Sequence, residues 1–332
     1  MSGPETVGAA VRRLATTFAE AGLDSPRLDA ELLVADAIGA DRARIFLSPD
    51  RVLTAEQAAR VAAHERGRAV ERASVAHLLG VRGFRRLDLT VDDRVLIPRP
   101  ETELLVELGL ELPRGAFVVD VGTGSGAIAL ALADERPDLE VHATDVSVAA
   151  LEVARENAAR LGGAVTFHEA DLLDGVPGPE GAGHRRPARI DGGARPGEAG
   201  AAGPGGGAEE RGAARRPSSP GEPRTADGPR TIAVLSNPPY IPDGDLATLP
   251  PEVARHDPHL ALFGGADGLD VVRRLLPAAR AFGAVIVGVE IGAGQAEATA
   301  ALARAAGFPE TEIRDDLAGI GRVVVGRTGA GA

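Results

Sequence analysis

The stretch VVDVGTGSGAIALALA, residues 118–133, contains the pattern from which the type of fold can be inferred. An apolar run is followed by three glycines at alternate positions, Gly122, Gly124 and Gly126, and then by a run rich in alanine and leucine. This order is typical of a buried strand, a tight turn and a helix. Glycines in such a turn let the backbone approach a ligand with no side chain in the way.

Short apolar runs and helical stretches alternate from about residue 116 onward. Strand–helix alternation of this kind predicts an α/β fold, with a mainly parallel sheet that helices cover on both faces. The strand-like runs are AFVVDV, VHATD, AVTFHEAD, TIAVLSN, AVIVGVEI and RVVVGR.

The chain before this region has a different pattern. Apolar residues recur at every third or fourth position from residue 5 to about 75, which predicts amphipathic helices. The stretch FRRLDLTVDDRVLI then has an alternation that suits a hairpin or connecting strands. We therefore expect a small helical domain at 1–80, a connecting segment at 81–110 and an α/β domain at 111–330.

Residues 175–230 interrupt the α/β pattern. They are rich in glycine, proline, alanine and arginine and contain almost no large apolar side chains, so they cannot bury enough surface to offset ordering. The segment is predicted to be a disordered insertion between two strands. Lengthening a loop about tenfold costs only roughly 2 kcal/mol, so the fold tolerates it.

Composition narrows the function classes. The 332-residue chain has a net charge of −12, no lysine and no cysteine, which excludes disulfides, thiolate metal sites and a cysteine nucleophile. The negative charge argues against stable nucleic-acid binding, and no apolar run is long enough to span a membrane. Only His256 and His259 lie close together, and the intervening proline favours a loop, so no metal site is expected. We expect a cytoplasmic monomer.

Acidic residues follow the strand-like runs where a nucleotide would bind. Asp145 lies 19 residues after Gly126, and a carboxylate there can accept hydrogen bonds from both ribose hydroxyls. This arrangement is shared by nicotinamide dinucleotide and S-adenosylmethionine sites, and the spacing GxGxG favours S-adenosylmethionine. Asp120 is expected either to support the loop backbone or to approach the cofactor's amino group, and Asp171 and Leu172 to border the adenine.

The stretch IAVLSNPPYIPDGD, residues 232–245, ends another strand-like run with polar and rigid residues. Ligands of parallel sheets bind at the carboxyl ends of strands, so these residues should lie beside the reactive end of the cofactor. The side-chain carbonyl of Asn237 and the backbone carbonyl of Pro238 can hold both N–H groups of a planar NH2 group, and Tyr240 can lie flat against it. The prolines fix the backbone and add no competing N–H group. The motif predicts methylation of either an exocyclic adenine nitrogen or a glutamine amide.

On these residues the chain resembles the release factor glutamine methyltransferases (HemK/PrmC type), a family of class I S-adenosylmethionine-dependent enzymes. The resemblance covers nearly the whole chain outside 175–230, and IPRPETE is its most discriminating part, because adenine methyltransferases with NPPY do not generally carry it there. The matching stretches are LDSPRLDAELLVADAIG, VDDRVLIPRPETELLVE, DVGTGSGAIALALA, SNPPYIP, PPEVARHDPHLALFGGADGLDVVRRLL and GFPETEIRDDLAGIGRVVVGR.

The resemblance implies a seven-stranded, mainly parallel Rossmann-like sheet, S-adenosylmethionine as cofactor, and N5-methylation of the glutamine in the Gly-Gly-Gln motif of class 1 peptide chain release factors. The helical N-terminal domain would help to dock the release factor. Asn237, Pro238 and Tyr240 would be catalytic. The substrate glutamine would contact Asn237, Pro238, Pro239 and Tyr240, with Arg99 and Glu101 shaping the pocket. The cofactor would contact Gly122, Thr123, Gly124, Ser125, Gly126, Asp145, Asp171, Leu172 and Asn237.

Three stretches depart from the family pattern: the long insertion, GFRRLDL at 83–89 in place of an aromatic-rich hairpin, and Gly321 where an acidic residue is common. None of them touches the glycine loop or NPPY. Three other functions are weighed against glutamine methylation: adenine-N6 methylation of DNA or RNA, a catalytically idle binding module, and a nicotinamide oxidoreductase. The acidic charge and IPRPETE argue against the first, the intact NPPY against the second, and the third gives NPPY no role.

Overall fold

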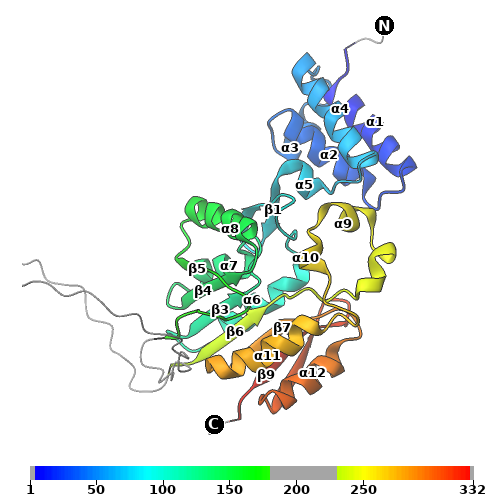
Figure 1. Ribbon diagram of the computed structural model, residues 1–332. Helices are drawn as coiled ribbons and strands as arrows, with labels where there is room; N and C mark the ends of the chain where they lie inside the picture. Colours follow the sequence, from blue (N-terminus) through cyan, green and yellow to red (C-terminus); the bar gives the residue numbers. More distant parts are fainter. Residues whose placement is uncertain (1–3, 180–229, 330–332) are drawn as a thin grey trace, which may run out of the picture.

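A computed structural model describes residues 4–179 and 230–329. The first part of the chain forms a group of helices that enclose their own apolar core, which includes Leu14, Phe18, Leu33 and Val61 (Figure 1). Threonine, aspartate and serine side chains cap four of these helices by accepting hydrogen bonds from the first turn, which explains where the helices begin. The helices are α1 (Val7–Glu20), α2 (Pro26–Ala37), α3 (Arg42–Leu47), α4 (Ala55–Ala69) and α5 (Val75–Leu79).

A seven-stranded sheet forms the centre of the remaining chain, in the order β5-β4-β3-β6-β7-β9-β8. The first five strands in this order are parallel, and β9 pairs antiparallel with both β7 and β8. The predicted seven-stranded, mainly parallel α/β fold is confirmed. The strands are β3 (Phe117–Val121), β4 (Glu140–Asp145), β5 (Val165–Glu169), β6 (Ile232–Ser236), β7 (Ile286–Glu290), β8 (Glu310–Asp315) and β9 (Gly321–Arg327).

Helices cover both faces of the sheet. Strands β3 and β6 are buried throughout, and alternate residues enter two different cores: Val118 and Leu235 contribute to one, Val119 and Val234 to the other. This is why these strands read as continuous apolar runs. The first core includes residues of α6 (Glu103–Leu110), α7 (Ala127–Glu135) and α8 (Val148–Leu161), and the second includes residues of α11 (Asp270–Phe282) and α12 (Ala296–Ala305).

The connecting segment is a short hairpin followed by irregular chain. Strands β1 (Val81–Phe84) and β2 (Leu87–Thr90) pair antiparallel, so the hairpin lies at 81–90, whereas residues 91–97 of the predicted stretch contain no strand. The IPRPETE stretch then forms a 3-10 turn, η1 (Pro100–Thr102), which leads directly into α6. Proline and glutamate in the first turn suit such a helix start.

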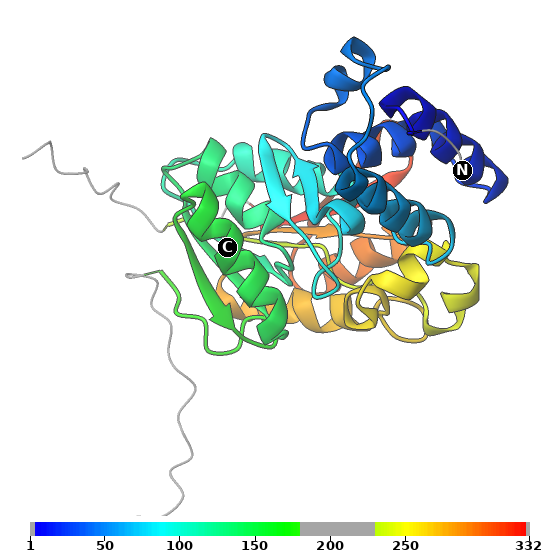
Figure 2. The same ribbon diagram turned by 90° about the horizontal axis from the view of Figure 1, so that it is seen from above.

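The chain after NPPY lies beside the N-terminal helices (Figures 1 and 2). It contains η2 (Asp243–Thr248), α9 (Pro251–His256) and α10 (His259–Leu262). Glu252 of α9 pairs with Arg68 of α4 at 3.0 Å and with Arg72 at 2.8 Å, and His256 bonds to the backbone carbonyl of Glu71. The N-terminal helices are therefore attached to the strand end that carries NPPY.

The residue pattern did not reveal β8, whose side chains are mostly exposed or half-buried on the edge of the sheet. Most of the predicted insertion, 180–229, lies outside the described residues, and Val176, which was assigned to it, packs into the second core. In the described ranges, no helix has the length and apolar character needed to cross a membrane.

Candidate active site

The glycine loop between β3 and α7 has the backbone geometry that its sequence predicts. Gly122, Gly124 and Gly126 have φ angles of +73°, +56° and +86°, a region that side-chain-bearing residues rarely adopt. A Cβ atom at Gly122 or Gly124 would meet no protein atom within 4 Å, whereas at Gly126 it would lie 2.9 Å from Leu130. The first two glycines therefore leave open space, whereas the third leaves room for the Leu130 side chain of α7.

Two carboxylates hold this loop in place. Asp145 at the end of β4 accepts hydrogen bonds from the backbone N–H groups of Gly124 and Ser147, each at 2.9 Å. Asp120 at the end of β3 accepts from the Thr123 hydroxyl at 2.6 Å and from the Ala129 N–H at 3.2 Å. Of the two roles considered for Asp120, the structure shows that of supporting the loop.

A cavity with a volume of about 340 Å³ lies at the carboxyl ends of β3, β4 and β6. The glycine loop and the residues after β4 line one side, and the NPPY strand end lines another. Of the sequence-predicted site residues, the cavity is lined by Gly122, Thr123, Gly124, Ser125, Asp145, Asp171, Leu172, Asn237, Pro238 and Pro239. The lining does not include Gly126, Tyr240, Arg99 or Glu101.

The chain after β5 closes the cavity near Asp145. Leu172 has a φ of +57°, a strained conformation for a residue with a side chain, and its carbonyl accepts a 2.8 Å hydrogen bond from the Thr144 hydroxyl. Asp171 is half exposed and pairs with Arg274 of α11 at 2.5 Å. The strained turn thus directs two sequence-predicted residues to the cavity.

The Asn237 side chain is the best-defined polar group on the opposite side. Its Nδ2 atom donates to the Thr102 hydroxyl at 3.1 Å, while its Oδ1 atom is buried and has no hydrogen-bond partner in the protein. A buried acceptor without a donor is costly unless a ligand supplies one. The amide thus has a partner for its nitrogen, while its oxygen keeps its capacity to accept a hydrogen bond.

Tyr240 lies behind the cavity lining, in a tightly packed turn. Its backbone carbonyl accepts from Gln295 Nε2 at 3.0 Å, and a Cβ on Gly268 would come within 2.1 Å of that carbonyl oxygen. Burial, with Glu290 nearby, raises the pKa of the Tyr240 phenol to about 12. The hydroxyl is neutral at physiological pH, as it would also be at its ordinary pKa of 10.0.

Arg99 and Glu101 contribute to the surroundings of this turn. Arg99 pairs with the buried Asp257 at 2.7 Å and so connects the IPRPETE stretch to the chain between α9 and α10. Burial raises the pKa of Asp257, and Arg99 opposes that rise. Glu101 acts through its charge, which raises the pKa of both Tyr240 and Glu290.

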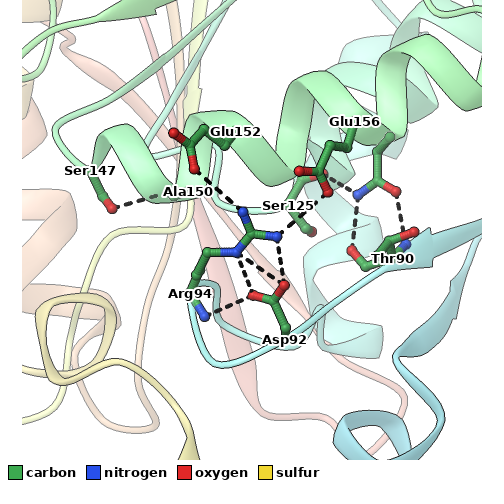
Figure 3. A network of polar contacts seen from close by, with 9 residues as sticks. Thr90, Asp92, Arg94, Ser125, Ser147, Ala150, Glu152 and Glu156 are labelled. Carbon is green, nitrogen blue, oxygen red and sulfur yellow. Dashed lines mark hydrogen bonds and ion pairs between the residues drawn. The ribbon is translucent and has the colours of Figure 1, made fainter.

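A polar network that sequence reasoning missed connects the hairpin to the glycine loop (Figure 3). The Asn157 side chain in α8 is fully buried and donates to the carbonyls of Thr90 and Ser125, each at 3.0 Å. Arg94, which lines the cavity, pairs with Asp92 at 2.7 Å and faces two glutamates of α8 (Figure 3). Nothing in the local sequence of α8 distinguishes Asn157, because its partners lie 32 and 67 residues away.

Histidines and acidic residues form no metal centre in the ranges 4–179 and 230–329, since no group of three could hold an ion there. His256 ends α9 and His259 begins α10, with each side chain turned to a different backbone carbonyl.

Family models and curated relatives agree on what this chain resembles. Residues 9–80 match the model described as PrmC N-terminal domain, and residues 100–180 match the methyltransferase small domain. The release factor glutamine methyltransferase of Geobacter sulfurreducens is 35% identical over 316 residues, covering 94% of this chain and 93% of the relative. That of Deinococcus radiodurans is 37% identical over 318 residues, covering 94% of each chain.

The Rossmann-like sheet, the glycine-loop cavity and the matching domain define this protein as a methyltransferase. The extent of identity with the curated relatives makes the family specific. The chain belongs to the release factor glutamine methyltransferase family, which confirms the resemblance inferred from its motifs.

Proposed function

We propose that this enzyme transfers a methyl group from S-adenosylmethionine to the side-chain amide nitrogen, N5, of the glutamine in the Gly-Gly-Gln motif of class 1 release factors. The observation that carries the proposal is Asn237, a residue that lines the cavity and whose buried Oδ1 atom has no hydrogen-bond partner while its Nδ2 atom is bonded to Thr102. The names of the relatives, which are release factor glutamine methyltransferases, support the same substrate.

The residues on the glycine-loop side fit S-adenosylmethionine. Open space above two positive-φ glycines accommodates a ligand pressed against the backbone. Each Asp145 oxygen has a backbone donor but retains accepting capacity for a ribose hydroxyl. When bound, the cofactor supplies an electrophilic methyl group. We propose that it contacts Gly122, Thr123, Gly124, Ser125, Gly126, Asp145, Asp171, Leu172 and Asn237.

The substrate side provides acceptors for a poor nucleophile. An amide nitrogen is weakly nucleophilic because its lone pair is delocalised into the carbonyl, so its orientation has to be held firmly. We propose that Asn237 Oδ1 and the Pro238 carbonyl each accept one N–H of the substrate amide and thereby aim its nitrogen. Pro239 stiffens the turn, and Tyr240 packs against the amide plane. Positioning of this kind lowers barriers by roughly 7–11 kcal/mol.

The docking of the release factor is proposed for the side where the N-terminal helices meet α9. The ion pairs of Glu252 with Arg68 and Arg72 couple those helices to the chain that follows NPPY. Arg99 and Glu101 lie beneath this junction and shape the approach to Tyr240. We propose one helical docking domain at 1–80, the connector at 81–110 and the catalytic domain at 111–330, acting as a cytoplasmic monomer that forms a transient pair with its substrate.

The family comparisons do not favour the runner-up function, adenine-N6 methylation of nucleic acid. The net charge of −12 also opposes a stable complex with a polyanion.

Transfer of labelled methyl from S-adenosylmethionine tests the proposal directly. The substrates are an intact release factor, the same factor with its Gly-Gly-Gln glutamine changed to glutamate or alanine, and genomic DNA. Label is expected only on the intact factor. The carboxylate of a glutamate has only hydrogen-bond acceptors, and it would face the two acceptors that hold the substrate amide, Asn237 Oδ1 and the Pro238 carbonyl. Label on DNA without label on protein would contradict the assignment.

A further inference from the structure

Helix α10 forms a wall of the cavity and is attached at both ends to stretches that carry sequence-predicted site residues. At its carboxyl end, the Leu262 carbonyl accepts a 2.9 Å hydrogen bond from the N–H of Ile241, the residue after NPPY. At its amino end, Asp257 lies directly before the cap residue Pro258 and pairs with Arg99 of IPRPETE at 2.7 Å. The residues of this wall that line the cavity are Pro258, Leu260 and Ala261.

The two members of the ion pair differ in burial. The Asp257 side chain is 1% exposed, whereas that of Arg99 is 34% exposed. Asp257 Oδ2 accepts from Arg99 Nη2, while Asp257 Oδ1 lies 3.8 Å from His77 Nε2 of α5, and neither of these two buried atoms has a hydrogen-bond partner. A buried carboxylate is costly without a compensating charge, so Asp257 depends on Arg99.

The Arg99 side of the pair leads to the NPPY strand end by two short hydrogen bonds. Arg99 is the N-cap residue of η1, and its carbonyl accepts from the N–H of Thr102 at 3.2 Å. The Thr102 hydroxyl in turn accepts from Asn237 Nδ2 at 3.1 Å. The Arg99–Asp257 pair therefore connects the stretch that bonds to Asn237 with the helix that forms the neighbouring wall.

We propose that Asp257 is a positioning residue for methyl transfer, which acts by holding Arg99 and so fixes the spacing between the IPRPETE stretch and the α10 wall. The inference rests on the proposed function. Asp257 does not belong to the cavity lining, so it acts through these two walls and not by touching substrate or cofactor. A displacement of reacting groups by about 1 Å can lower a rate about 100-fold, which is why such spacing matters.

The test uses variants of the full-length enzyme and measures kcat and KM with a release factor, S-adenosylmethionine affinity, and unfolding in urea. Asp257→Ala, Arg99→Ala and the double variant all remove the pair. Each is expected to lower kcat about 10-fold, to a common level, with less than about 3-fold change in S-adenosylmethionine affinity. Arg99→Lys is expected to retain most of kcat, because the pair uses a single Arg99 nitrogen, which an ammonium group can replace.

The stabilities of the three variants are expected to differ even though their kcat values agree. Arg99→Ala leaves a buried carboxylate without its cation, whereas Asp257→Ala leaves a partly exposed guanidinium that water can reach. Arg99→Ala should therefore have the lowest urea midpoint, and the double variant should regain part of the loss. A residue that only supports the fold would give kcat values in this order of stability, whereas a positioning residue gives equal kcat values.

Asp138 provides a matched control, because it pairs with Arg136 at 2.8 Å and neither residue lines the cavity. Asp138→Ala is expected to lower the urea midpoint and to leave kcat unchanged.

The possible results also distinguish this inference from the proposed function. Wild-type kcat in Asp257→Ala, or kcat values that follow the stabilities, would overturn the positioning role while leaving the function intact. If the alanine variants do not fold, Asp257→Asn takes their place, because it keeps the side-chain shape and weakens the pair. It is expected to lower kcat about 3-fold or more, and wild-type kcat would again overturn the role. A wild-type enzyme that binds S-adenosylmethionine but methylates no release factor would overturn both.

Discussion

Asp120 and Glu290 are two buried carboxyl groups that lie behind opposite halves of one cavity, and burial raises the pKa of both to about 7. Asp120 receives two hydrogen bonds from the glycine loop itself, through Thr123 and Ala129. Glu290 has a buried Oε2 atom without a partner, and its pKa is lowered by Thr102, whose hydroxyl accepts from Asn237 Nδ2. The two carboxyl groups thus have similar environments but different partners.

The difference lies in what remains free at the cavity. On the loop side, both supporting carboxylates are bonded to backbone N–H groups, so the loop is formed before any ligand arrives. One buried oxygen lacks a donor on each side, Asp120 Oδ1 behind the loop and Asn237 Oδ1 in NPPY, but of these two residues only Asn237 belongs to the cavity lining. We infer that the first half is preorganised to hold a cofactor, and the second to receive hydrogens from a substrate.

The largest effect is expected in the pH dependence of stability. The folded-state pKa of Asp120, about 7, exceeds its ordinary value of 3.8, so the folded protein binds more protons than the unfolded chain between these values. Stability conferred by the neutral carboxyl is therefore lost as the pH rises from about 4 to 7, by on the order of 4 kcal/mol. Asp120→Asn should remove the part of this slope that comes from Asp120 and leave that of Glu290, whose pKa is also about 7; urea unfolding of both proteins at about pH 5 and pH 8 measures the difference.

Asp138 is a control for this experiment, because its pKa is shifted in the opposite direction from that of Asp120. Its pKa is lowered by the Arg136 guanidinium, so Asp138→Asn should destabilise the protein by a similar amount at both pH values. If Asp120→Asn shows the same slope as the wild type between these pH values, the Asp120 carboxyl does not titrate as described.

The next effect concerns the free acceptor on the NPPY side. Asn237→Ala should lower kcat for release-factor methylation about 100-fold, since one of two acceptors for the reacting amide is lost. Equilibrium dialysis should show a much smaller loss in S-adenosylmethionine affinity. If Asn237→Ala weakened S-adenosylmethionine binding as much as it lowers kcat, Asn237 would act mainly by holding the cofactor.

The cofactor half is tested by a matched pair of aspartates at the cavity. Asp145 is partly buried and fixed by two backbone bonds, whereas the Asp171 side chain is half exposed and paired with Arg274. Asp145→Ala should weaken S-adenosylmethionine binding about 10-fold or more, as expected for charge-assisted hydrogen bonds. Asp171→Ala should weaken it less than about 3-fold, because exposed groups contribute little. A larger loss of S-adenosylmethionine affinity in Asp171→Ala than in Asp145→Ala would mean that Asp145 does not hold the ribose.

How much of this could be predicted from the sequence depended on the distance between partners. The glycine loop was predictable because its φ requirements are local, and Asp145 because strand ends of a parallel sheet converge. Thr102 was not predicted as a site residue, because its bond to Asn237 joins positions that are 135 residues apart in the sequence. Edge strand β8 was missed because it lacks a continuous apolar run.

The smallest effect is expected at Tyr240, where the prediction concerns the ring rather than the hydroxyl. The phenol is neutral, with a pKa of about 12, and the residue lies in a turn fixed by Gln295 and Gly268. If the ring packs against the substrate amide, Tyr240→Phe should change kcat less than about 3-fold, while Tyr240→Ala should raise KM and lower kcat about 10-fold or more. Steady-state kinetics with an intact release factor measure both. A large loss in Tyr240→Phe would instead assign the hydroxyl a hydrogen bond to substrate, and the free acceptors of Asn237 and Pro238 would then not suffice to hold the amide.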